Sequence, residues 1–148
     1  MFALQVYLAG PLFTIGERNY CLEVKSMLKG QGMDVLWPWE LTDQEGADGS
    51  KEANLTIFRR NIDAIDACDL LVVILDGPDV DSGTAWEVGY AFSKSKPIYG
   101  IRTDFRLSGE NSNSIVNLMI SQSTPKIARS ISELDSLLRQ ELPKASNN

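Results

Sequence analysis

The sequence predicts an α/β protein with a parallel sheet of about five strands and helices on both faces. Short apolar runs typical of strands alternate with longer segments whose apolar residues have helical spacing. This alternation indicates parallel strands, because a parallel connection needs a crossover that is usually a helix. The expected winding is flavodoxin-like, a Rossmann-like arrangement. The length of 148 residues fits one domain, 1–148, with a flexible tail at about 143–148.

Each expected element follows from its local pattern. Gly30 ends the first helix, and the capping-box pattern from Ser130 to Glu133 opens the last. Polar segments at 41–51 and 102–113 are expected to be loops. The predicted strands are 4–8, 33–37, 69–75, 97–101 and 126–128, and the predicted helices lie around 20–30, 55–65, 83–94, 115–120 and 131–138.

Composition excludes several kinds of chemistry and partner. The chain has no histidine, so Ser-His-Asp or Cys-His catalysis and histidine metal sites are excluded. The net charge of −6 argues against a nucleic-acid polymer as partner. Cys21 and Cys68 lack CxxC spacing and are expected to be buried thiols in a reducing cytoplasm. The first residues lack a basic region and no apolar run is long enough to span a membrane, so we expect a cytoplasmic protein with no membrane partner.

The usual nucleotide-binding fingerprints are absent from the sequence. No GxGxxG and no GxxxxGK[ST] occurs, and the Gly10-Pro11 turn offers few N–H groups because proline has none. Carboxylates and aromatic residues instead follow the predicted strands, and the carboxyl ends of parallel strands share one edge of a sheet. Such a pocket suits glycosyl chemistry, in which a carboxylate meets a cationic sugar carbon and rings stack on a base. The residues expected at this edge are Tyr7, Gly10, Pro11, Phe13, Trp37, Trp39, Glu40, Asp76, Asp79, Asp81 and Glu87.

Glu87 is the most informative of these carboxylates. It follows the apolar run 70–75 and an acidic, glycine-bearing loop, in the first turns of the next predicted helix. A carboxylate at that place is expected to be kept ionised by the helix dipole and to act as a nucleophile. The alternative is structural, since Thr84 to Glu87 also has the spacing of a capping box.

Four segments carry a resemblance to a known family. They are YLAGP at 7–11, Asn61 ahead of Cys68-Asp69, DSGTAWEVGYA at 81–91, and NLM at 117–119. Over about residues 5–122 the chain resembles the nucleoside 2-deoxyribosyltransferases. The D-x-G-T-A-x-E-x-G-x-A pattern is fairly specific, whereas related nucleotide hydrolases share YLAGP, and NLM points to the transferase branch.

The resemblance implies a retaining double displacement on a 2′-deoxynucleoside. Glu87 would attack C1′ and release the base, and a second free nucleobase would then attack the deoxyribosyl ester. Asp81 would hydrogen-bond the nucleoside, and Tyr7 would orient the nucleophile. No metal or organic cofactor is implied. The structural alternatives are a loop acid or N-cap for Asp81 and core packing for Tyr7, while Asp76 and Asp79 are expected to be solvated loop residues.

The remaining predicted site residues are substrate contacts. The Gly10-Pro11 turn brings backbone close to the ligand, and Gly83 is a further expected substrate contact. Phe13 and Trp39 are expected to stack on the base unless they are core residues, and Trp37 is expected to be buried. Asn61, rather than the outward-facing Asp63, is expected to contact the base. Because Asn is not an acid, the proton donor to the leaving base is open among Asp81, Glu40 and water.

The resemblance also implies a homo-oligomer, a dimer or a multiple of dimers. Asn117 and Met119 would complete the neighbouring subunit's site, where Asn117 would bind the sugar 5′-hydroxyl; the alternative is a helix N-terminus and a core methionine.

Two other functions remain open at this point. One is hydrolysis of 2′-deoxynucleoside 5′-monophosphates by the same carboxylate. The phosphate donors would then be Arg102, Arg106, Ser112 and Ser114. The other is a non-catalytic nucleotide-binding module, because a fold does not fix a function.

Overall fold

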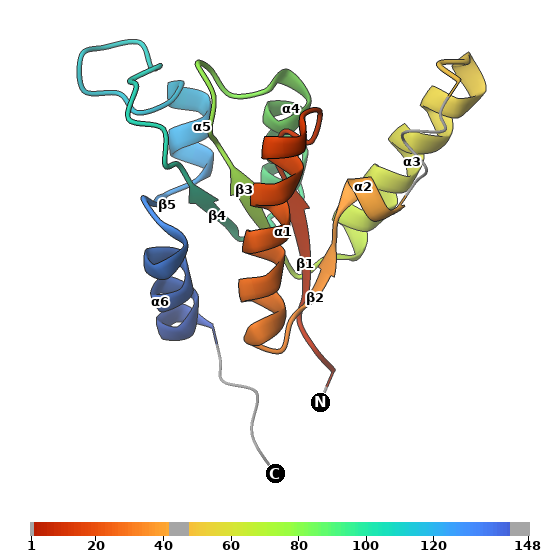
Figure 1. Cartoon of the computed structure of the whole chain (residues 1–148), viewed down its shortest axis with the longest axis horizontal. Coiled ribbons are helices and arrows are strands. Elements are labelled where there is room, and N and C mark those ends of the chain that lie inside the picture. The colour runs from red at the N-terminus through yellow and green to blue at the C-terminus, as the bar shows by residue number, and fades with distance from the viewer. Residues whose placement is uncertain (1, 42–47, 143–148) are drawn as a thin grey trace.

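The chain folds around one five-stranded parallel sheet, which confirms the predicted class and the flavodoxin-like order. The structure is a computed structural model that describes residues 2–41 and 48–142. The predicted tail at 143–148 and most of the predicted loop at 41–51 lie outside the described residues. The strand order is β2-β1-β3-β4-β5 (Figure 1). The strands are β1 (Gln5–Ala9), β2 (Asp34–Leu36), β3 (Leu70–Ile74), β4 (Ile98–Ile101) and β5 (Lys126–Ala128).

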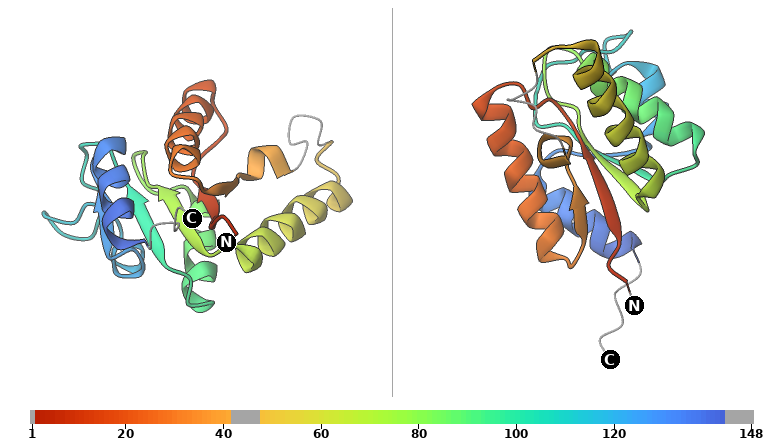
Figure 2. Two further views of the ribbon diagram at one scale, coloured as in Figure 1. Left: turned by 90° about the horizontal axis from the view of Figure 1, so that it is seen from below. Right: turned by 90° about the vertical axis from the view of Figure 1, so that its right-hand side faces the viewer.

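Helices cover both faces of this sheet (Figure 2). One apolar cluster joins α1 (Ile15–Gly30) and α6 (Ile131–Glu141) to Val6, Leu8 and Val72 of the sheet. A second cluster joins α3 (Lys51–Ala67), α4 (Ser82–Ser93) and α5 (Leu118–Ser123) to Tyr7 and Leu71. Successive strand residues therefore face opposite layers, as the two-residue period of a strand requires. This alternation places Tyr7 on the side of the sheet that α4 covers.

Side-chain caps explain where the helices begin. Thr14 accepts a hydrogen bond from the Glu17 N–H at 3.1 Å and opens α1, while the Glu17 carboxylate accepts from the Thr14 N–H at 2.8 Å. Ser130 caps α6 as predicted. Asn117 caps α5, so this helix runs from Leu118 to Ser123 instead of the predicted 115–120. The sequence also missed the short helix α2 (Pro38–Leu41), which begins directly after Trp37.

Helix α3 extends away from the rest of the molecule at the upper right of Figure 1. The apolar residues of α3 are fully buried only toward its C-terminal end, where Ile65 is 0% exposed. Leu55 and Phe58 on the extended part are 42% and 48% exposed. The Phe58 ring lies 5.6 Å from the Trp86 ring of α4, and Trp86 is 49% exposed. An apolar surface formed by Leu55, Phe58 and Trp86 is therefore open to solvent in one chain.

Gly10 is required by close packing between the turn after β1 and the end of β3. A Cβ atom at Gly10 would lie 2.9 Å from the Cβ of Ile74, closer than real Cβ contacts allow. Ile74 is a branched residue in the central part of the sheet, so it has little room to move.

Gly10→Ala is therefore expected to lower the free energy of unfolding by about 1–3 kcal/mol, because the added methyl group overpacks the sheet edge. Urea denaturation measures the change. Gly89→Ala is the matched control: its Cβ would meet nothing within 4 Å in helix α4, so it is expected to be neutral or stabilising. Equal effects of the two substitutions would contradict this account of Gly10.

Candidate active site

Glu87 and Tyr7 form the centre of the candidate site. The Tyr7 hydroxyl donates a hydrogen bond to Oε2 of Glu87, across 80 residues of sequence. Tyr7 is fully buried in β1, and Glu87 is half-buried on α4. The sheet and the helix that packs on it thus fix the carboxylate from two sides.

The electrostatic environment of Glu87 differs from the sequence expectation. Burial raises its pKa to about 7, the Tyr7 hydrogen bond opposes this rise, and the negative charge of Asp81 adds to it. The helix dipole has little influence on this pKa, because α4 begins at Ser82 and Glu87 lies in its second turn, beyond the range of the dipole's main effect. Burial and the Glu87 charge raise the pKa of Tyr7 far above its usual value, so its hydroxyl remains a donor.

The capping alternative for Glu87 is also wrong, because Asp81 performs that task. Oδ2 of Asp81 accepts from the N–H and the hydroxyl of Thr84, each at 2.9 Å. Asp81 is thus the N-cap of α4, as one of the two structural readings expected, and these bonds occupy one of its two carboxylate oxygens. Its charge is close enough to raise the pKa of Glu87. Gly83, in the first turn of α4, is exposed.

Two predicted base contacts, Phe13 after β1 and Trp39 after β2, both lie against Arg18. Phe13 is 69% exposed and Trp39 is half-buried. Nη1 of Arg18 donates to the carbonyls of Leu12 and Phe13 at 3.0 Å each, and the guanidinium lies 4.5 Å from the centroid of the Trp39 ring. No sequence pattern singled out Arg18, which lies in the first turn of α1.

The neighbouring positions agree with the sequence patterns in part. Trp37 is 2% exposed, as expected, and Pro11 is buried. Glu40, one of the three candidate proton donors, forms an ion pair with Lys25 at 2.5 Å. This pair ties α2 to α1, so Glu40 has a structural task that its sequence position did not show.

Among the predicted site residues, Asn61 has a buried side-chain oxygen without a hydrogen-bond donor in the described part of the chain. It is half-buried on α3 whereas Asp63 is exposed, in agreement with helical spacing. Its Oδ1 is buried and has no hydrogen-bond partner among the described residues. A buried acceptor without a donor is costly, so a ligand N–H at this position would be favoured.

The loop after β4 corrects two expectations. Asp76 is a structural anchor rather than a solvated residue: its carboxylate accepts from the N–H and hydroxyl of Thr103, both at 2.6 Å, and from the Asp104 N–H at 2.9 Å. Arg102 is fully buried and donates to the carbonyls of Leu75 and Arg106. Arg106 pairs with Asp104 at 2.6 Å. The two expected arginine donors for a phosphate therefore already have partners: Arg102 bonds backbone carbonyls and Arg106 pairs with Asp104.

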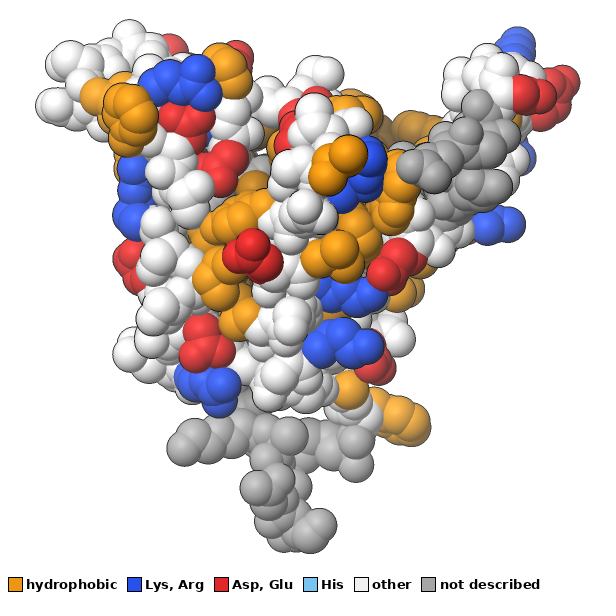
Figure 3. Space-filling view, viewed as in Figure 1, with side chains coloured by type: hydrophobic (Ala, Val, Ile, Leu, Met, Phe, Trp, Pro, Cys, Tyr) orange, Lys and Arg blue, Asp and Glu red, His pale blue; other side chains and the backbone are white. Residues whose placement is uncertain are grey.

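Asn117 and Met119 lie at the surface. Met119 is 68% exposed and Leu118 is 50% exposed, so the core position that the structural alternative gave Met119 is wrong. The other part of that alternative holds, because Asn117 caps α5 by accepting from the Met119 N–H at 2.9 Å. Figure 3 shows further hydrophobic side chains at the surface at its upper left, over the loop before α5. Phe105 of this loop is 86% exposed.

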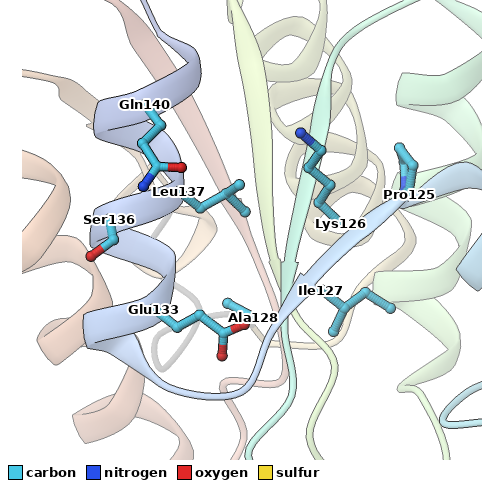
Figure 4. A pocket seen from close by; sticks show the side chains of 8 residues that line it. All are labelled: Pro125, Lys126, Ile127, Ala128, Glu133, Ser136, Leu137 and Gln140. Carbon is cyan, nitrogen blue, oxygen red and sulfur yellow. The ribbon is translucent and has the colours of Figure 1, made fainter.

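A groove of about 460 Å³ lies elsewhere, between the edge strand β5 and α6 (Figure 4). None of the predicted site residues lines it. Its lining residues are Pro125, Lys126, Ile127, Ala128, Glu133, Ser136, Leu137 and Gln140. We therefore place the candidate site at Glu87 and not at this groove.

Residues 2–41 and 48–142 contain neither a metal-binding cluster nor a membrane-spanning helix. No group of three or more cysteine and carboxylate residues there is arranged to hold a metal ion. No helix in the same ranges is long and apolar enough to cross a membrane.

Comparison with known proteins identifies the family. Residues 6–119 match the profile of the nucleoside 2-deoxyribosyltransferases. The chain belongs to this family. Among solved structures, it is similar to the 2-deoxyribosyltransferase of Bacillus psychrosaccharolyticus, with a TM-score of 0.74, 27% identity, and 88% of this chain and 90% of the other covered.

Two further relatives extend this comparison. The 2-deoxyribosyltransferase of Leishmania mexicana has a TM-score of 0.74 and 26% identity, over 95% of this chain and 99% of the other. An uncharacterised protein of Ureaplasma parvum is 30% identical, over 77% of this chain and 78% of its own length. Family and structural neighbours together support a glycosyl-transferring enzyme.

The raised pKa of Glu87 predicts that the free energy of unfolding depends on pH. The folded-state pKa of about 7 exceeds the ordinary value of 4.5, so the stability that this carboxyl contributes is full below pH 4.5 and is lost as the pH rises through 7. Glu87→Gln removes the buried charge and keeps an oxygen that accepts from Tyr7. Its free energy of unfolding is expected to exceed that of wild type by on the order of 2 kcal/mol at pH 8 and to differ little at pH 4.

Urea denaturation at the two pH values checks this expectation. Glu23→Gln is the control, because Glu23 is an exposed carboxylate on α1. A Glu87→Gln protein that is less stable than wild type at high pH would contradict a buried, high-pKa carboxyl.

Proposed function

We propose that the protein exchanges the base of a 2′-deoxynucleoside through a covalent deoxyribosyl-Glu87 ester. The observation that carries the proposal is the half-buried Glu87 carboxylate held by Tyr7 beside Asp81. A carboxylate with a pKa of about 7 is substantially ionised at neutral pH. It is also poorly solvated, which strengthens its interaction with a developing positive charge at C1′.

The reaction proceeds by two displacements at C1′. In the first, an oxygen of Glu87 forms a bond to C1′ as the C1′–N bond breaks, and the leaving base takes up a proton. In the second, a ring nitrogen of another base attacks C1′ from the opposite face, loses its proton and restores the carboxylate. Two inversions give retention at C1′. No step requires a metal or an organic cofactor.

In this proposal the residues around Glu87 position the carboxylate and bind the nucleoside. Tyr7 holds one oxygen of Glu87, which leaves the other for attack. Asp81 uses its oxygen that is free of the Thr84 bonds to contact the nucleoside. Asn61 offers its unpartnered Oδ1 to an N–H of the base. Phe13 and Trp39 flank the base, and Gly10, Pro11 and Gly83 provide close backbone approach.

We also propose that the active form is a homo-oligomer in which Asn117 and Met119 complete the neighbouring site. Leu118 and Met119 are 50% and 68% exposed, and Leu55, Phe58 and Trp86 form a second open apolar surface. Exposed apolar patches of this kind mark interfaces. Asn117 would there donate to the 5′-hydroxyl of the substrate.

Nucleoside substrates are favoured over nucleoside 5′-monophosphates. The expected phosphate donors Arg102 and Arg106 are held by backbone carbonyls and by Asp104. A monophosphate hydrolase would need a basic pocket that these contacts do not leave free.

The test is chromatography of deoxyinosine with free adenine, using wild type and Glu87→Ala in parallel. Deoxyadenosine is expected from wild type, with a rate at least about 1,000-fold lower for the variant, because removal of a nucleophile removes the covalent route. Tyr7→Phe is expected to retain partial activity, since Glu87 remains but loses the hydrogen bond that positions it and favours its ionised form.

Two results would contradict the proposal. Hypoxanthine and free deoxyribose without deoxyadenosine would indicate a hydrolase. Ligand binding with no turnover in either protein would indicate a non-catalytic binding module.

A further inference from the structure

A carboxylate that no sequence motif singled out lies against Asn117. Oε1 of Glu110 accepts from Nδ2 of Asn117 at 2.6 Å, and both Glu110 oxygens accept from the Leu118 N–H at 3.0 Å. Oδ1 of Asn117 accepts from the Met119 N–H at 2.9 Å. These bonds fix the orientation of the amide and leave one N–H of Asn117 for another acceptor.

The loop backbone holds Glu110 in this position. The N–H of Gly109 donates to the Ser114 carbonyl at 3.1 Å, and that of Ser108 donates to the Ile115 carbonyl at 3.2 Å. A Cβ at Gly109 would lie 2.1 Å from the Cβ of Ser114 and 2.5 Å from the Val116 carbonyl oxygen, so only glycine allows this approach. Glu110 is therefore carried next to Asn117 by a closely packed turn.

No cation offsets the charge of Glu110 among the residues that the structure describes. The ion pairs found there do not include it. The arginines of the same loop, Arg102 and Arg106, are engaged elsewhere. A carboxylate without a paired cation thus lies beside the amide that would meet the 5′ end of the substrate.

We propose that Glu110 is a specificity-determining residue that makes the site select a free 5′-hydroxyl over a 5′-phosphate. The inference rests on the proposed function, in which Asn117 binds the 5′ end. A group hydrogen-bonded to Asn117 lies within about 6 Å of the Glu110 carboxylate, because each hydrogen bond spans about 3 Å. A hydroxyl is neutral at that distance, whereas a phosphate carries about −1.5 to −2 charges and is repelled.

The experiment compares the binding of deoxyinosine and deoxyinosine 5′-monophosphate, measured by calorimetry. Both proteins carry Glu87→Ala, so that no turnover occurs, and one of them also carries Glu110→Gln. The glutamine oxygen still accepts from Asn117 and from the Leu118 N–H, so the loop geometry is kept and only the charge is lost.

The preference for the nucleoside over the monophosphate is expected to fall by roughly tenfold or more in the Glu110→Gln protein. The change is expected in the monophosphate Kd, with the deoxyinosine Kd altered by less than about twofold. In the protein that carries Glu87→Ala alone, raising the ionic strength is expected to reduce the ratio of the monophosphate Kd to the deoxyinosine Kd, because salt screens the repulsion.

Glu23→Gln in the same background is the matched control, because it removes one negative charge from an exposed position on α1. An unchanged preference after Glu110→Gln, the same change after Glu23→Gln, or no binding of either ligand would overturn the proposal. The base-exchange assay on the unsubstituted protein tests the proposed function separately. A shift in binding preference without base exchange would support Glu110 as the discriminating residue and contradict only the proposed reaction.

Discussion

The candidate site depends on the hydrogen bond from Tyr7 to Glu87. It joins the first strand to the helix that follows the central strand, across 80 residues of sequence. The bond forms because β1 and β3 are adjacent in the sheet and α4 packs on the face that Tyr7 shares. Gly10 allows the turn after β1 to approach Ile74 at the end of β3. The position of the Glu87 carboxylate therefore depends on how β1, β3 and α4 pack together.

The same arrangement controls the ionisation of Glu87. Burial raises its pKa to about 7, and the Tyr7 hydrogen bond limits that rise. Asp81, which is committed to the N-cap of α4 through Thr84, brings a second negative charge near it. Stability and the proposed function thus have opposite requirements here, because the ionised form that the proposed reaction needs is the one that folding disfavours. This conflict is typical of functional sites.

The sequence predicted the fold class, the strand order and the convergence of Tyr7, Asp81 and Glu87 on one edge, because these follow from apolar periodicity and from the geometry of parallel sheets. Long-range side-chain partners could not be predicted in the same way. The burial of Arg102, the anchoring by Asp76 and the contacts of Arg18 and Glu110 depend on loops that approach only in the folded chain. The observed start of a helix differs from the predicted start where a side-chain cap determines the first turn, as Asn117 does for α5.

The most direct test of the account is the titration of the Glu87 carboxyl in the free protein and in Tyr7→Phe. NMR of the 13C-labelled side chain, assigned with Glu87→Gln, reports its protonation. The account predicts a pKa near 7 in wild type and a higher value in Tyr7→Phe, since the hydrogen bond that stabilises the ionised form is lost. A wild-type value close to 4.5, or one that Tyr7→Phe leaves unchanged, would show that burial and Tyr7 do not control this carboxylate.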